Sequence, residues 1–136
     1  MLRHAAVMLL LSLPAVAQTA EEPKAAAQKA AETWLQGVDA GKYAESWDAA
    51  AALFKKAVSR NQWQEAMAGT RAPLGALGSR KLKSATLAKT LPGAPDGEYV
   101  VLEFETSFEK KKSAIETVTP MRDPDGAWRV SGYFIR

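Results

Sequence analysis

Glu116 is the first candidate for chemistry. It lies in a predicted strand, and the sequence does not show which face of that strand points to the interior of the protein. If Ile115 and Met121 face the interior, Glu116 faces solvent and is inert. If Ala114 and Val118 face the interior, Glu116 is a buried carboxylate, and burial raises the pKa of such a group. A carboxyl group with a raised pKa can hold a proton near neutral pH. Glu116 is therefore a candidate ligand-binding residue.

Arg71 and Tyr43 are the other two candidate ligand-binding residues. Arg71 could bind an anion, although pairing with a carboxylate or with carbonyl groups at a helix end is the more frequent role. Tyr43 follows Asp39 by four residues, a spacing that could form a carboxylate–phenol pair of the kind that isomerases use. An aspartate at a helix end and a tyrosine in the core explain the same spacing without chemistry. We assign no catalytic residue.

Residue types that catalysis and metal binding usually need are scarce in this sequence. The chain has no cysteine, and its one histidine, His4, lies in the N-terminal segment. We therefore expect no thiol nucleophile, no thiolate metal site and no Ser-His-Asp triad. Neither G-x-G-x-x-G nor the phosphate-binding G-x-x-x-x-G-K-[ST] motif occurs. The sequence predicts no metal and no cofactor, and it favours a protein that is not an enzyme.

The first 17 residues form a predicted secretory signal peptide. Arg3 gives a basic start, residues 5–13 are apolar, and the sequence Ala-Val-Ala at 15–17 matches an A-x-A cleavage site. The apolar run is too short to span a bilayer. We expect a periplasmic or secreted protein that begins near Gln18, just after Ala17. Residues 18–24 would be a short flexible start, and no stable membrane insertion would follow cleavage.

The charge balance argues against nucleic acid as a partner. The 136-residue chain carries 18 Lys and Arg against 15 Asp and Glu, a net charge of +3. Its one basic run, Lys110–Lys112, is short and lies between two strand patterns, which is typical of a solvated hairpin loop. Binding to nucleic acid or to an anionic membrane needs a larger cluster of cations.

Helical patterns fill the first part of the predicted mature chain. Apolar residues recur at helical spacing in Lys24–Ala40, and Gly41 is placed to end this helix. A second helix is predicted to start near Lys42. Ser59 and Gln62 have the spacing of a capping box, which predicts the start of a third helix. The next proline must end it.

Strand patterns follow, punctuated by two Pro-Asp-Gly turns. Residues 98–109 alternate most clearly. Residues 113–122 form a second strand that Pro120 should make irregular, because proline cannot donate to a ladder. Residues 80–90 are a weaker strand whose lysines are typical of a sheet edge. In the last strand, residues 127–136, strict alternation predicts one face with Trp128, Val130 and Phe134, and another with Tyr133 and Ile135.

These elements predict an α+β fold, with three N-terminal helices packed on a curved, mainly antiparallel four-stranded sheet. The length suits one domain over residues 25–136.

Several short motifs, taken together, resemble a bacterial exported family known only as domain of unknown function 4019, over roughly residues 25–136. The resemblance implies an architecture similar to nuclear-transport-factor-2-like or cystatin-like proteins, with helices on the concave side of a curved sheet, and it implies no activity. The motifs are Tyr43-x-x-x-Trp47, Phe54-Lys55, Trp63, Arg71-x-Pro73-Leu74-Gly75, Ser79-Arg80, Leu91-Pro92-Gly93, Gly97-Glu98-Tyr99, Glu116-Thr117-Val118, and Gly126-x-Trp128-Arg129-Val130-x-Gly132-Tyr133-Phe134.

Three functions remain open, and we favour the first. A non-catalytic module would bind a small molecule or an envelope protein in a small aromatic pocket. An enzyme without metal or histidine would show two converging ionisable groups, a carboxylate and a tyrosine, in a cavity. A self-associating structural protein would form a homodimer through an exposed apolar patch on its sheet.

Overall fold

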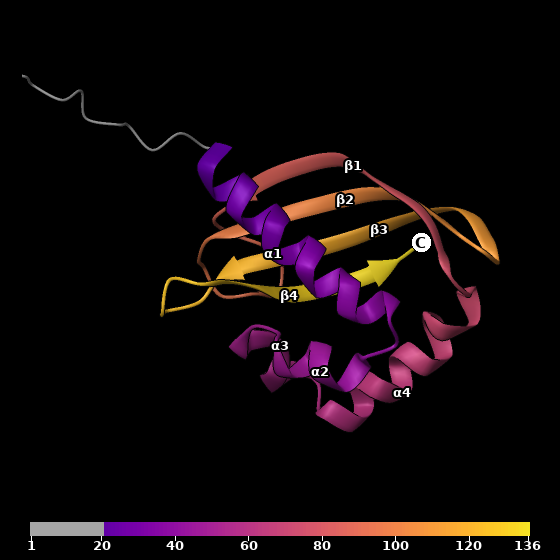
Figure 1. The fold of residues 1–136 in the computed structure, drawn as a ribbon. Helices are drawn as coiled ribbons and strands as arrows, with labels where there is room; N and C mark the ends of the chain where they lie inside the picture. The colour runs from indigo at the N-terminus through magenta and orange to yellow at the C-terminus, as the bar shows by residue number, and fades with distance from the viewer. Residues whose placement is uncertain (1–20) are drawn as a thin grey trace, which may run out of the picture.

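The computed structural model describes residues 21–136, so the predicted signal peptide and residues 18–20 of the predicted flexible start lie outside the described residues. Residues 21–24, the rest of that predicted start, form the first turn of a helix. No helix among these residues is long and apolar enough to cross a membrane. Figure 1 shows helices first and strands after, the α+β order predicted from the sequence. The helices are α1 (Glu21–Asp39), α2 (Tyr43–Asp48), α3 (Ala52–Ala57) and α4 (Arg60–Thr70), followed by a 3-10 turn, η1 (Ala72–Leu74). The strands are β1 (Leu77–Ala88), β2 (Tyr99–Phe108), β3 (Lys111–Arg122) and β4 (Trp128–Ile135).

The four strands form one antiparallel sheet in chain order, β1-β2-β3-β4. Each strand therefore pairs with the next along the chain, and β1 and β4 are its two edges. The sheet is curved, and α1 crosses one face of it in contact with all four strands (Figure 1). The shorter helices lie below α1 and β4 in this view. The core is formed between the covered face and the helices.

Helix α1 buries a stripe of residues three and four apart, as its pattern predicts: Ala27, Ala31, Trp34, Leu35 and Val38. Gly41 then ends the helix with φ +76°, a conformation that glycine adopts without strain. The Lys42 N–H bonds to Gly37 O at 2.9 Å and the Gly41 N–H to Val38 O at 3.0 Å. These two bonds form a Schellman motif and direct the chain into α2.

The second predicted helix is two helices, so the prediction of three helices is corrected to four. The break occurs at Ala51, whose backbone is extended (φ −63°, ψ 153°) and whose N–H bonds to Val130 O at 2.8 Å. A hydrogen bond to β4 thus replaces the intrahelical bond that a continuous helix would make. The predicted capping box of α4 is confirmed: the backbone and side chain of Ser59 and Gln62 bond reciprocally.

Register shifts interrupt all three ladders of the sheet, and those in the two edge strands bear most on what the sheet presents. In β1 the register shifts at Gly78 and at Lys83, and in β4 it shifts at Ser131, which lies opposite the Thr119–Pro120 step. The irregularity predicted at Pro120 is therefore confirmed, with the additional residue on the partner strand. This bulge also makes the predicted faces of β4 wrong. Strict alternation groups Val130 with Phe134, but one additional residue reverses the parity beyond Ser131.

As a result, Val130 and Tyr133 both face the helices. Val130 is buried, whereas the Phe134 side chain is 56% exposed on the other face.

Candidate functional site

Glu116 lies on the helix-covered face of β3 and is fully buried. Of the two faces open for Glu116 in the sequence, the structure shows the inner one, because Ala114 and Val118 face the interior with it. Three side chains donate hydrogen bonds to its carboxylate. Arg80 Nε lies 2.7 Å from Oε1, Thr106 Oγ1 lies 2.6 Å from Oε1, and the Tyr133 hydroxyl bonds to Oε2.

Arg80 connects Glu116 to a second carboxylate. Its two terminal nitrogens donate to Asp39, at 2.8 Å from Oδ2 and 2.9 Å from Oδ1. Burial alone would lower the pKa of Arg80, but the hydrogen bonds to Asp39 and Glu116 outweigh burial and raise it. Arg80 is therefore a permanent cation between two anions.

Arg71 is the second cation of this cluster and is 2% exposed. It follows α4, and its guanidinium donates to Gly75 O at 2.7 Å and to Asp39 Oδ1 at 3.2 Å. The same group lies 4.4 Å from the centre of the Phe108 ring, within the range of a cation–π contact. Of the two roles open for Arg71 in the sequence, these contacts match pairing with a carboxylate and with backbone carbonyl oxygen.

Tyr133 reaches the cluster because of the Ser131 bulge, which turns its side chain toward the helices. Burial raises the pKa of Tyr133 well above its ordinary value of 10, and the charge of Glu116 and their hydrogen bond raise it further. The phenol therefore stays protonated and donates to Glu116. Its ring packs edge-on against Trp34, with ring centres 5.3 Å apart.

The structure thus brings together two of the three candidate ligand-binding residues. Arg71 and Glu116 belong to one buried cluster, which we call the Asp39–Glu116 cluster: Asp39, Arg71, Arg80, Thr106, Glu116 and Tyr133. Tyr43 lies outside it, half-buried on α2. The carboxylate–phenol pair of Asp39 and Tyr43, the less favoured of the two interpretations of their spacing, is not observed, because Arg71 and Arg80 bond to that carboxylate.

Sequence reasoning missed Arg80 and Tyr133 as members of the cluster. Arg80 faces inward beside Thr106, its partner on β2. Tyr133 could not be placed by strict alternation, since a bulge intervenes. Two carboxylates face two guanidinium groups in the cluster, so its formal charges balance. Such balance satisfies buried charges, and it leaves no cluster carboxylate without a cationic partner.

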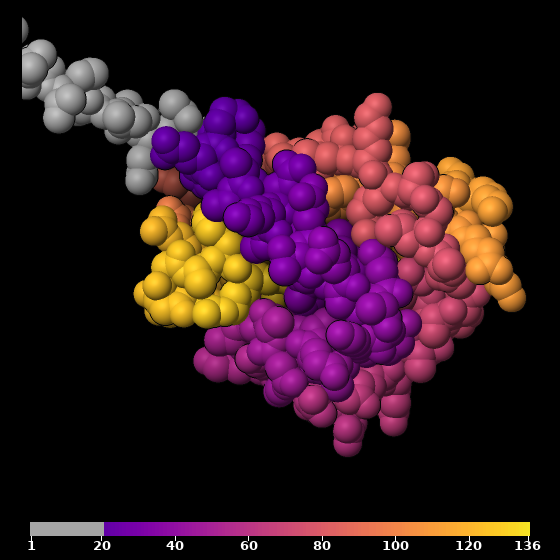
Figure 2. All heavy atoms as spheres, in the orientation of Figure 1, coloured from indigo at the N-terminus to yellow at the C-terminus, as the bar shows by residue number. Residues whose placement is uncertain are grey.

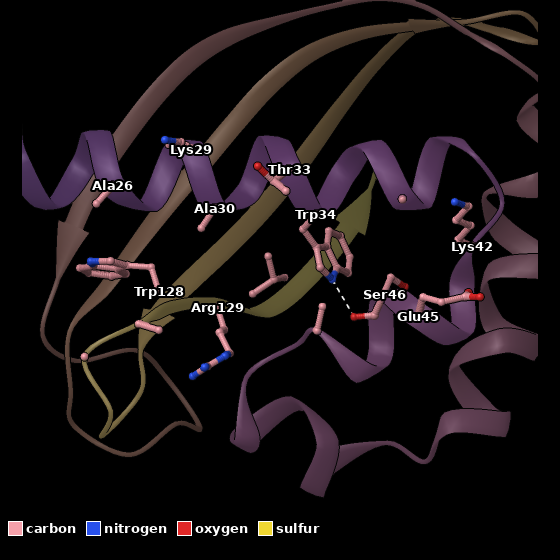
Figure 3. Close-up of a pocket in the computed structure, with 15 residues that line it drawn as sticks. Ala26, Lys29, Ala30, Thr33, Trp34, Lys42, Glu45, Ser46, Trp128 and Arg129 are labelled. Atoms are coloured by element: carbon pink, nitrogen blue, oxygen red, sulfur yellow. Dashed lines mark hydrogen bonds between the residues drawn. The ribbon is translucent and has the colours of Figure 1, made fainter.

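A groove of about 660 Å³ is a separate feature, because none of the residues that line it belongs to the cluster. Helix α1 forms one wall, α2 the second, and the β3–β4 turn with the start of β4 the third (Figure 3). Small residues of α1 face it at helical spacing, and their short side chains leave the space open: Ala26, Ala30, Thr33 and Gly37. In Figure 2 the face that carries this groove shows α1 crossing above the C-terminal strand and the shorter helices.

Two indole rings line the groove. Trp128 lies at the end near the β3–β4 turn (Figure 3). Trp34 lines its inner part, and its only polar atom is satisfied, since Nε1 donates to Ser46 O at 2.8 Å. The groove therefore presents mostly apolar surface, with the polar tips of Lys29, Lys42 and Glu45 around it.

Arg129 fixes the turn that forms the third wall. It donates to Asp123 Oδ2 at 2.9 Å and to both carboxylate oxygens of Asp125 at 2.9 and 2.8 Å. The hydrogen bond from Arg129, aided by one from the Ala127 N–H, lowers the pKa of Asp125 to about 2. Above that pH both partners are charged, and their ion pair connects Arg129, the residue after Trp128, to the turn.

The comparisons with known proteins identify the family. The model of "Protein of unknown function (DUF4019)" matches residues 30–133. The chain belongs to this family. No curated protein matches it.

The matched range of this DUF4019 chain contains every residue of the Asp39–Glu116 cluster and most of the groove. Within residues 21–136, no group of three or more His, Asp or Glu side chains is arranged to hold a metal ion. Another hollow, of about 420 Å³, lies between α4 and the end of β4, and Tyr133 is one of the residues that line it. Chemically, the DUF4019 chain offers an apolar groove, a charge-balanced interior cluster and a smaller cleft at a sheet edge.

Proposed function

We propose that this chain is an exported, non-catalytic binding module, periplasmic or secreted, that takes an apolar small molecule or an apolar group of an envelope partner in the groove beside α1. The observation that carries the proposal is the groove itself, about 660 Å³ with two indoles in its lining. Ligand pockets usually have a few hundred cubic ångströms, mostly apolar walls and a few polar groups. This groove fits that description.

Helices on one face of a curved sheet also support the proposed kinship with nuclear-transport-factor-2-like and cystatin-like proteins. In such an arrangement the helices and sheet can leave an apolar opening between them. Fold alone assigns no ligand. The groove, and not the kinship, supports binding.

Catalysis has less support from the geometry. The two ionisable groups that converge, Glu116 and Tyr133, are hydrogen-bonded to each other, and Glu116 is fully buried. The raised pKa of Tyr133 keeps its phenol protonated, so it is a poor general base at neutral pH. Neither residue lines the larger groove.

Dimerisation through the sheet face also has less support. Among residues 21–136 the exposed large apolar side chains are Leu77, Leu87 and Phe134. The two leucines lie on β1 and the phenylalanine on β4, which are opposite edges of the sheet. Side chains this far apart do not form a continuous apolar patch of the kind that marks an interface.

Filling the groove tests the proposal. Ala30 lies on the groove wall, and Ala30→Trp should occupy the space without adding charge. The probe is the neutral dye N-phenyl-1-naphthylamine, whose emission rises in apolar sites. We expect the wild-type protein, starting at Gln18, to raise its fluorescence saturably. Ala30→Trp should abolish the rise, and Trp128→Ala should weaken binding about thirtyfold, since burying a large side chain contributes ~2 kcal/mol.

Ala25→Trp is the matched control, because Ala25 is exposed on the same helix and does not line the groove. It should bind the dye like the wild type. Equal binding by Ala30→Trp and Ala25→Trp would refute the groove as the site. Native mass spectrometry of the protein from a periplasmic extract would then identify any co-purified ligand, and N-terminal sequencing would test cleavage after Ala17.

A further inference from the structure

The two edges of the sheet differ in how they are protected. Edge strands expose unpaired backbone groups, and proteins usually shield them with charges and bulges. Edge strand β1 has both, with exposed Lys81 and Lys83 and register shifts at Gly78 and Lys83. Edge strand β4 lacks both kinds of protection over residues 132–135. This segment contains no charged residue and no register shift.

The pairing of β4 shows which of its backbone groups are open. Arg136 and Ile115 exchange two hydrogen bonds, at 2.8 and 3.0 Å. In an antiparallel ladder such pairs alternate with pairs that make no mutual hydrogen bond. The N–H and C=O groups of Tyr133 and Ile135 therefore point away from β3. No backbone group elsewhere in residues 21–136 bonds to them.

A hollow lies next to this open edge. Its volume is about 420 Å³, and Trp63, Met67 and Leu74 provide apolar wall on the side of α4 and η1. Ile135 lines it from β4. An extended chain that paired with β4 could place alternate side chains in this hollow.

The charge around the hollow indicates the partner. Lys111 and Arg136 are the charged side chains that line it. Arg136 also forms a salt bridge with Glu103 Oε1 at 3.4 Å, so its charge is shared with that carboxylate, which is not part of the lining. A second copy of β4 would bring its own Arg136 to an edge that already carries Lys111 and Arg136, which disfavours self-pairing. An acidic chain would be attracted instead.

We propose that the edge of β4 at residues 132–135 is a strand-addition site for an extended acidic peptide segment of a partner protein, with alternate apolar side chains in the hollow. The site shares no lining residue with the groove beside α1. It therefore stands independently of the function proposed for that groove.

A synthetic peptide tests the site directly. The probe is a fluorescein-labelled octapeptide of alternating valine and glutamate, measured by fluorescence anisotropy against the protein starting at Gln18. We expect saturable binding that weakens as salt rises. A valine–lysine peptide should not bind, because Lys111 and Arg136 repel it. The same acidic peptide with N-methylated backbone amides should also fail to bind, since it cannot pair as a strand.

Protein variants locate the binding. Ile135→Pro removes one N–H from the open edge and leaves the ladder to β3 unbroken, so thermal unfolding should change little while peptide affinity falls about tenfold or more. Lys111→Glu with Arg136→Glu should reduce affinity about tenfold. Lys110→Glu is the control, because Lys110 is exposed in the same hairpin outside the hollow, and it should bind nearly as the wild type does.

Any one of four results from the binding experiments would overturn the proposal. They are absence of binding by the acidic peptide, equal binding of the N-methylated peptide, equal binding of the lysine peptide, and equal binding by the lining and control variants. A dimer in sedimentation that Ile135→Pro dissociates would assign the edge to a second copy and would also overturn it. Amide resonances of Tyr133 and Ile135 should shift on addition of the acidic peptide.

Discussion

Glu116 and Arg80 form the centre of the interior charge balance. The carboxylate is fully buried, and the guanidinium nitrogen Nε lies 2.7 Å from it. A buried ion pair adds less stability than its short distance suggests, because both charges lose water. Removing one partner is different, since the other charge is then buried without compensation.

Glu116→Gln should therefore lower the free energy of unfolding by about 3 kcal/mol. The substitution keeps the size of the side chain and leaves a positive charge in excess among Asp39, Arg71 and Arg80. Glu105→Gln on the exposed face of β2 is the control and should change stability by less than about 0.5 kcal/mol. Urea unfolding followed by tryptophan fluorescence measures both. Equal stability of the two variants would contradict this account of the cluster.

Tyr133 should make the protein sensitive to alkali. The pKa of Tyr133 is raised in the folded state above 10, so above pH 10 the unfolded chain loses this proton while the folded chain keeps it. The stabilisation is present in full below pH 10 and declines above it, by up to about 1.4 kcal/mol per pH unit. Tyr133→Phe should lack this component of the decline.

The measurement compares the free energy of unfolding between pH 9 and 11 for the wild type, Tyr133→Phe and Tyr43→Phe. Tyr43→Phe keeps Tyr133 and should follow the wild-type slope. At pH 7, Tyr133→Phe should be less stable by about 1 kcal/mol, because Glu116 loses a hydrogen-bond donor. Parallel pH profiles for all three proteins would show that Tyr133 does not titrate abnormally.

At the scale of the elements, bulges decide what the strands present. Without Ser131 in its bulge, Tyr133 would face the far side of the sheet and Phe134 would face the helices. The sequence located this irregularity, since Pro120 cannot donate to a ladder. It did not show which strand would hold the additional residue. For that reason the four strands were predictable, whereas the face of Tyr133, and with it the cluster, was not.

The helices show the same contrast between local and distant causes. Gly41 and the Ser59–Gln62 box are local signals, and both correctly marked helix ends. The break at Ala51 has a distant cause, the hydrogen bond to Val130 O. No residue near Ala51 distinguishes it from a helix interior, so one long helix was the natural prediction.

Ser59→Ala should lower the free energy of unfolding by about 1 kcal/mol, because the first turn of α4 loses the acceptor for the Gln62 N–H. Helix α4 carries Trp63 and ends next to Arg71, so its stability is transmitted to the core. Ser113→Ala, at an exposed position of β3, is the matched control and should be neutral. Thermal and urea unfolding of both variants would decide whether this cap contributes.

For the whole molecule, the order of elements was readable from the chain. Helical spacing gave way to period-two alternation near Gly78, which correctly indicated an α+β protein with a four-stranded antiparallel sheet. The groove could not be predicted, because it arises where small residues of α1 face Trp128, about a hundred residues later. Arg71 and Glu116 were chosen separately, and only the fold shows that Asp39 and Arg80 join them.

The Asp39–Glu116 cluster also bears on the order of folding events. Its members come from α1, the end of α4 and all four strands, so they meet only when nearly the whole chain has docked. Contacts between residues this far apart in sequence carry a large loop-closure entropy and tend to form late. Substitutions in the cluster should accordingly accelerate unfolding much more than they slow folding. The cluster would then form after the folding transition state and determine the unfolding rate, and so the lifetime of the native state.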